Sequence, residues 1–160
     1  MNNNTLYTAA VELLSQLIAT PSFSKEEDKT ALIIEQFFQQ HGIPTNRFLN
    51  NVWAVNQHYD ATKPSLLLNS HHDTVKPNKG YTVDPFDPVQ QDGKLFGLGS
   101  NDAGGCLVSL IATFLHFYAA ENLSYNIVFA ASAEEEISGT NGIEALLPQL
   151  PALEFGIVGE

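Results

Sequence analysis

Residues 64–75, P-S-L-L-L-N-S-H-H-D-T-V, constrain the fold of this chain more than any other stretch. The three leucines at residues 66–68 form a short apolar run without alternation, which is typical of a strand buried on both faces in a parallel sheet. His71, His72 and Asp73 follow it directly. Ligands of open α/β sheets gather just beyond the carboxyl ends of the strands. The stretch therefore predicts a functional site at the end of this strand.

His71 and Asp73 are two residues apart, so their side chains point the same way in an extended chain. This spacing lets a carboxylate lie beside an imidazole that binds a metal ion and fix its tautomer. A buried strand that merely ends in a polar turn explains the pair equally well. The rest of the chain has to decide between these two interpretations.

Charge and cysteine content exclude several classes of protein. The formal net charge of −11 leaves no basic patch to replace phosphate counterions, so we expect no nucleic-acid partner. The acid excess fits a cation site, and equally a solvated acidic surface. Cys106 is the single cysteine, which rules out an intrachain disulfide and predicts a reducing, cytoplasmic location. With no signal peptide and no apolar run of about 20 residues, we expect no membrane partner.

Hydrophobic periodicity predicts alternating helices and strands. An amphipathic helix is expected over residues 5–19, ended by Pro21. Ser24 and Glu27 predict a capping box that opens a second helix, which Gly42 closes. Strands are expected at 45–49, 52–56, 65–71, 125–131 and 155–158, with a short helix at 141–147. Together these elements predict an α/β fold with a mostly parallel central sheet.

A glycine-rich run, G-L-G-S-N-D-A-G-G, occupies residues 97–105. It does not suit a dinucleotide, because Asp102 would repel a pyrophosphate at the start of the helix predicted over 104–120. A plain glycine-rich connector stays open as an alternative. We favour a flexible backbone that turns the Asp102 oxygens inward, at the head of a helix that is apolar on nearly every side and so buried.

More acidic residues follow the later strands. Glu134, Glu135 and Glu136 come just after the strand at 125–131, and Glu160 follows the last strand. Three adjacent carboxylates at the end of a buried strand repel one another unless cations or protons intervene. A solvated first turn of a helix is the alternative, since acidic residues are favoured there.

Four separate loops thus deliver imidazole or carboxylate groups to what should be one edge of one sheet. These groups are His71 with Asp73, Asp102, Glu135 with Glu136, and Glu160. Chance readily places one ligating group after a strand, but it does not readily place such groups after four. Nitrogen and oxygen ligands of this kind suit zinc, and carboxylates can bridge two metal ions about 3.5–4 Å apart.

The same four segments resemble the motifs of the M20 metallopeptidase family, which includes acetylornithine deacetylase, succinyl-diaminopimelate desuccinylase and the glutamate carboxypeptidases. S-H-H-D-T-V resembles G-H-x-D-T-V, and G-L-G-S-N-D-A-G-G resembles G-R-G-x-x-D-x-K-G-G. A-E-E-E resembles A-D-E-E, and the closing V-G-E resembles the start of G-E-P-T. The motifs occur in the family's order and span nearly the whole chain.

The resemblance implies a three-layer α/β/α, zinc-exopeptidase-like catalytic domain. Residues 1–160 would be its N-terminal half, without the lid or dimerisation domain and without the C-terminal catalytic half. A homodimer is the assembly that the resemblance allows for the full-length protein. These residues alone are expected to bind zinc poorly and to be inactive. The family also carries a cis peptide bond after its bridging aspartate, here Asp102.

Residue roles carry over position by position. His71 and Glu160 would hold one of two Zn²⁺ ions, for which Co²⁺ is a possible substitute. Glu136 would hold the other, and Asp102 would bridge both. Glu135 would be the general base, and Asp73 the partner that orients His71.

The chain departs from the family pattern at three points. Gly104 stands where many relatives have lysine, and Gly142 lies one residue further after the acidic triplet than is usual. His72 fills a variable position, and the family's second-metal histidine has no counterpart.

The activity implied is hydrolysis of the amide bond of an N-acyl amino acid. N-acetylornithine, in arginine biosynthesis, is the expected substrate, because the residues around His71 and Asp102 resemble those of the acetylornithine deacetylase branch of the family. Other M20 activities (desuccinylase, carboxypeptidase or dipeptidase) and a non-catalytic metal-binding relative stay open. An acidic protein that binds Ca²⁺ or Mg²⁺ also stays open, although His71 favours zinc over these hard cations.

Overall fold

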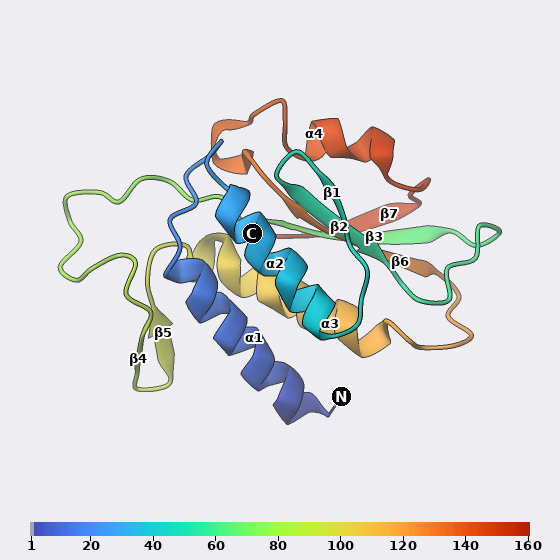
Figure 1. Cartoon of the computed structure of the whole chain (residues 1–160), viewed down its shortest axis with the longest axis horizontal. Coiled ribbons are helices and arrows are strands. Elements are labelled where there is room, and N and C mark those ends of the chain that lie inside the picture. Colours follow the sequence, from blue (N-terminus) through green and yellow to red (C-terminus); the bar gives the residue numbers. More distant parts are fainter. Residues whose placement is uncertain (1) are drawn as a thin grey trace.

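A five-stranded sheet forms the middle layer of the computed structural model, which describes residues 2–160 (Figure 1). Its strand order is β1-β2-β6-β3-β7. The bounds are Asn46–Phe48 for β1, Asn51–Val55 for β2, Ser65–His71 for β3, Asn126–Ser132 for β6 and Phe155–Gly159 for β7. β3 pairs in parallel with β6 and β7, while β2 pairs in antiparallel fashion with β1 and β6. Four of the five strands therefore run in one direction, which confirms the predicted mostly parallel sheet.

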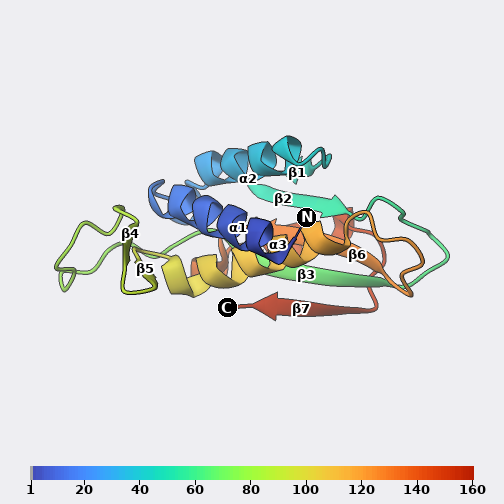
Figure 2. The same ribbon diagram turned by 90° about the horizontal axis from the view of Figure 1, so that it is seen from below.

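Helices cover both faces of this sheet (Figures 1 and 2). On one face lie α1 (Asn3–Ile18), α2 (Asp28–Gln40) and α3 (Cys106–Phe117). On the other lies the short α4 (Ile143–Leu146), which continues as a 3₁₀ turn over Leu147–Gln149. The expected α/β/α layering is therefore present. None of the helices in residues 2–160 is long and apolar enough to cross a membrane.

The two-sided cover explains why the strand sequences do not alternate. In β6, Ile127 and Phe129 pack against the helices of the larger layer, whereas Val128 and Ala130 pack with Leu146 of α4. Successive residues of a strand point to opposite faces, so burial on both faces demands apolar side chains at every position. The leucine run of β3 has the same cause.

Three aromatic rings join the larger helical layer to the sheet. Phe38 of α2, Phe114 of α3 and Phe129 of β6 are all fully buried. Their ring centroids lie 5.3–5.9 Å apart. Aromatic pairs at such separations contribute beyond the burial of their apolar area.

A small hairpin and two short turns complete the chain. β4 (Val89–Gln91) and β5 (Lys94–Phe96) pair in antiparallel fashion as a separate two-stranded sheet. A kinked turn over Ser100–Gly105, in which Asp102 and Ala103 have non-helical backbone angles, leads into α3, and a 3₁₀ turn over Glu135–Ile137 follows β6.

The predicted capping box at the start of α2 is wrong. The Ser24 hydroxyl donates instead to the Asp73 carboxylate, and the Glu27 side chain makes no capping hydrogen bond. Both side chains are used by contacts with distant parts of the chain, which local sequence spacing cannot reveal.

Two other predictions need smaller corrections. α3 begins at Cys106, and one of its sides, which includes Ser109 and Thr113, is exposed because α1 covers only part of the helix. The turn between β1 and β2 is at Leu49-Asn50, where Leu49 has a φ of 55°, and not at Asn50-Asn51.

Replacing Phe114 by alanine should cost about 3–5 kcal/mol of the free energy of unfolding, because it empties the centre of the aromatic contact between α3, α2 and β6. Urea unfolding followed by circular dichroism measures the loss. Phe117→Ala, three residues along the same helix where the ring is 39% exposed, is the matched control and should cost far less. Equal losses in the two variants would contradict this account of the core.

Candidate metal centre

The carboxyl ends of β3, β6 and β7 meet at one edge of the sheet, as their parallel register requires. The Nε2 atom of His71 is the centre of this edge. It lies 3.2 Å from Oδ1 of Asp102, 3.5 Å from Oε2 of Glu160 and 3.7 Å from Oε2 of Glu135. Three segments distant in sequence therefore bring carboxylates to one imidazole nitrogen.

The other ring nitrogen of His71 is held by Asp73. Nδ1 lies 3.0 Å from the carbonyl oxygen of Asp73 and 3.3 Å from its Oδ1, and both side chains are fully buried. Both neighbours are acceptors, so Nδ1 carries a proton, and Nε2 faces the cluster. Asp73 thus contacts the ring nitrogen of His71 that faces away from the cluster.

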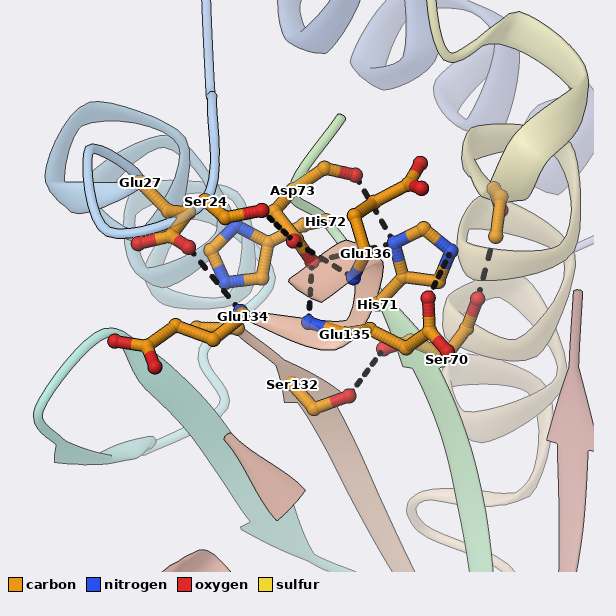
Figure 3. A network of polar contacts seen from close by, with 12 residues as sticks. Ser24, Glu27, Ser70, His71, His72, Asp73, Ser132, Glu134, Glu135 and Glu136 are labelled. Carbon is orange, nitrogen blue, oxygen red and sulfur yellow. Dashed lines mark hydrogen bonds and ion pairs between the residues drawn. The ribbon is translucent and has the colours of Figure 1, made fainter. Parts of the chain in front are cut away.

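Asp73 is also a hub for the residues around it (Figure 3). Its Oδ2 accepts from the Ser24 hydroxyl at 2.7 Å and from the Glu136 amide at 3.1 Å, and its Oδ1 accepts from the Glu135 amide at 3.1 Å. Burial disfavours its charged form, but the hydrogen bonds from His71, Ser24 and the two amides together outweigh burial. The pKa of Asp73 therefore lies below its ordinary value.

The acidic triplet is divided by a sharp turn of the backbone. Glu134 has a φ of 54°, which reverses the chain after β6. Figure 3 shows its side chain pointing away from His71, whereas Glu135 reaches toward His71. The Glu134 carboxylate accepts from the Asn141 side chain at 2.9 Å. Two of the three adjacent carboxylates thus face the cluster, and the third is held by Asn141.

Asp102 projects from a tight glycine-bounded segment. Gly99 has a φ of 75°, which an L residue rarely adopts, and a Cβ at Gly104 would overlap the carbonyl oxygen of Gly99. There is consequently no room here for the lysine that many relatives of the family have at the position of Gly104. The Asp102–Ala103 peptide bond is cis, as the resemblance implied.

Glu160 reaches the cluster through the pairing of β7 with β3. Ser70 lies opposite Gly159 in this register, and its hydroxyl donates to the Gly159 carbonyl oxygen at 2.8 Å. The thiol of Cys106, at the start of α3, donates to the Glu160 carbonyl oxygen at 2.8 Å.

The cluster carries excess negative charge. Burial lowers the pKa of His71, but Asp73 and Glu135 outweigh it and raise that pKa to about 9. Burial and the charge of Asp102 raise the pKa of Glu136 above its ordinary value. Within residues 2–160, no lysine or arginine forms an ion pair with these groups. Such a site is stabilised by a cation.

The donor atoms also lie close enough together to hold a metal ion. One set comprises His71, Asp102 and Glu136, and a second comprises His71, Glu135 and Glu160. In each set one donor atom per residue lies within 4.8 Å of the others. One imidazole with several carboxylates is a donor set that zinc accepts. The residues present therefore fit a divalent metal centre.

The sequence pattern that defines peptidase family M20/M25/M40 matches residues 67–159, which is more than half of the chain. The chain belongs to this peptidase family. The matched residues begin inside β3 and end with β7, so the M20 pattern includes the edge of the sheet where the cluster lies.

Solved M20 structures share the fold. An M20 family metallo-carboxypeptidase from Sulfolobus solfataricus is 21% identical with a TM-score of 0.75, and the match covers 99% of this chain and 37% of the carboxypeptidase. Human carnosine dipeptidase 1 is 19% identical with a TM-score of 0.71, and the match covers 97% of this chain and 39% of the dipeptidase. The YXEP protein of Bacillus subtilis, a dinuclear metal-binding M20 peptidase, is 16% identical with a TM-score of 0.71, and the match covers 98% of this chain and 43% of that protein. The chain spans about two fifths of the length of these proteins.

Two residues near the cluster were not predicted as part of it. Ser24 donates to Asp73 across 49 positions of sequence, and Glu27 accepts from the Glu134 amide across 107 positions. Both lie in the loop before α2, and their local spacing indicated only a helix cap. No signal in a single sequence distinguishes a cap from contacts over such separations.

The metal-free protein should lose stability as the pH rises from about 6.5 to about 9. The folded state raises the pKa of His71 from 6.5 to about 9, so its stabilisation is complete below pH 6.5 and is lost as the pH passes 9. The slope from one such group is at most about 1.4 kcal/mol per pH unit. Urea unfolding at a series of pH values, with a chelator present, measures it.

His71→Asn should flatten this slope, whereas replacement of the exposed His58 should leave it unchanged. A slope that persists in His71→Asn would show that other groups cause the pH dependence.

Proposed function

We propose that the protein carrying this chain is a metal-dependent hydrolase that cleaves the amide bond of N-acyl amino acids. The observation that carries this proposal is the buried imidazole of His71, which has carboxylate oxygens of Asp102, Glu135 and Glu160 within 3.7 Å of Nε2. Membership of a peptidase family supports the same class of reaction.

We assign His71 and Glu160 to one metal ion, Glu136 to a second, and Asp102 to a bridging position between them. The position of the Asp102 carboxylate, which is close both to His71 and to a Glu136 oxygen, supports the bridging assignment. The exposed Glu160 side chain places its Oε2 atom 3.5 Å from the same imidazole nitrogen. Imidazole and carboxylate ligands favour Zn²⁺, with Co²⁺ as a possible substitute.

When bound, two such ions would supply Lewis acidity, which lowers the pKa of water toward about 7 and stabilises negative charge on the substrate carbonyl oxygen. We assign the proton transfers to Glu135. Its carboxylate takes a proton from the attacking water as the water oxygen bonds to the acyl carbon. It then gives that proton to the amine as the C–N bond breaks.

Asp73 positions both the His71 ligand and the two acidic residues Glu135 and Glu136. Its contact with Nδ1 keeps Nε2 of His71 free to act as a ligand, and its hydrogen bonds to two amides hold the backbone of Glu135 and Glu136. A carboxylate behind a metal-binding imidazole fixes the ring and raises its basicity.

N-acetylornithine, in a cytoplasmic route of arginine biosynthesis, is the substrate we favour. The support is the resemblance of S-H-H-D-T-V and S-N-D-A-G-G to the deacetylase branch, together with an unpaired Cys106 that suits a reducing compartment. Peptides are the second candidate, because the structural neighbours named above include a carboxypeptidase and a dipeptidase.

A substrate panel tests the proposal. N-acetylornithine, N-succinyl-diaminopimelate and several dipeptides are incubated with the purified full-length protein that carries this chain, and release of free amine is measured. Turnover should disappear after chelation and return with Zn²⁺ or Co²⁺. Stoichiometric zinc without hydrolysis of any member of the panel would instead identify a metal-binding protein without catalytic activity.

Glu135→Gln should abolish turnover while the zinc content stays near that of the wild type, because the variant loses the proton acceptor and keeps every assigned ligand. Glu136→Gln is the matched comparison, since the same change one residue later removes a ligand and should lower both zinc content and activity. Zinc is measured by elemental analysis of dialysed protein. Loss of zinc in Glu135→Gln with retention in Glu136→Gln would mean that base and ligand are exchanged.

A further inference from the structure

Glu27 is a fully buried carboxyl group that lies outside the metal-ligand cluster. Its Oε1 accepts from the Lys25 amide at 2.7 Å and from the Glu134 amide at 3.1 Å, and its Oε2 accepts from Nδ2 of Asn50 at 2.8 Å. Figure 3 shows Glu27 beside the turn that begins at Glu134. The three donors come from the loop before α2, the turn between β1 and β2, and the turn after β6.

The position of Asn50 is itself fixed from two sides. Arg47 donates from Nη2 to Oδ1 of Asn50 at 2.9 Å, which directs Nδ2 of the same amide toward Glu27. The carbonyl oxygen of Asn50 lies 3.0 Å from Nε2 of the buried His72, whose Nδ1 lies 2.9 Å from the Thr30 hydroxyl. Glu27 is therefore held in one orientation by a continuous polar network.

Two buried carboxyl groups together hold the turn after β6. Glu27 accepts from the amide of Glu134, and Asp73 accepts from the amides of Glu135 and Glu136. Three consecutive backbone N–H groups thus donate hydrogen bonds to two carboxyl side chains from other elements. The direction of these N–H groups sets the path of the backbone from which Glu135 and Glu136 project.

A helix cap does not explain a buried acid at this position. Glu27 is the residue before α2, but its side chain makes no capping hydrogen bond. Burial of a carboxyl group is costly unless hydrogen bonds compensate it, and the Glu134 amide is one of only three such donors among residues 2–160.

We propose that Glu27 is a positioning residue for the metal centre: by holding the Glu134 amide, it directs Glu135 and Glu136 toward His71. The inference rests on the proposed function for its catalytic consequence, but the hydrogen bond itself is a property of the metal-free protein. Partners behind metal ligands typically change metal affinity or activity by about 10- to 100-fold when they are removed.

The test compares Glu27→Ala with Glu26→Ala, which removes the exposed acid of the preceding residue. Hydrogen–deuterium exchange by mass spectrometry follows the metal-free protein, in peptides that cover residues 133–137 and, as a reference, the core strand β6. Exchange at 133–137 should rise about tenfold or more in Glu27→Ala, with β6 and the Glu26→Ala protein unchanged. Titration of the full-length protein with Co²⁺ should show about 10- to 100-fold weaker binding and an altered visible absorption band in Glu27→Ala only.

Three results would overturn the proposal. These are unchanged exchange at 133–137, exchange that rises there in step with β6, and Co²⁺ binding and absorption identical to those of the wild type. If Glu27→Ala does not fold, Glu27→Met takes its place, because it fills a similar volume but offers no acceptor to the Glu134 amide. The same local rise in exchange at 133–137 is expected, and no rise there would refute the proposal. Failure of hydrolysis in the wild type would contradict the proposed function, while the exchange result would still decide the role of Glu27.

Discussion

The site depends first on the buried carboxylate of Asp73. It accepts hydrogen bonds from the Ser24 hydroxyl and from the amides of Glu135 and Glu136, and it contacts the imidazole of His71. These groups come from three separate parts of the chain. Because all of them meet on two oxygen atoms, one side chain joins the residues that follow β3 to the acidic turn that follows β6. Loss of that carboxylate would disturb the imidazole and the acidic turn together.

The sheet supplies the other half of this precision. β3 lies between β6 and β7 in parallel register, so the three strands end at the same edge. Their non-alternating apolar sequences are anchored in two cores, one on each face. A strand packed on both sides has little freedom to shift, so the residues that follow it leave the sheet at defined points.

The sequence predicted the elements with strong local signals and failed where distant contacts decide. The apolar run before His71 predicted β3 with its observed bounds, and the repeated polar residues after strands predicted that His71, Asp102 and Glu160 would meet. The spacing of Ser24 and Glu27 resembles a helix cap, yet both side chains bind groups far along the chain. The sequence analysis named Glu135 and Glu136 as the two acids of the triplet at this edge, but it could not give the cause, which is the positive φ at Glu134 that separates them from the third acid.

The exposure of the cluster residues suggests the order in which a metal ion would be captured. The His71 side chain is fully buried, whereas the carboxylates of Asp102, Glu160 and Glu135 are 69%, 59% and 46% exposed. A hydrated cation that approaches from solvent would therefore meet exposed oxygen ligands first and a buried nitrogen last. Loading would be a stepwise exchange of water for carboxylate, completed by the imidazole. Its rate would depend on the exposed outer side chains, and the buried nitrogen behind them would favour a softer ion over harder ones.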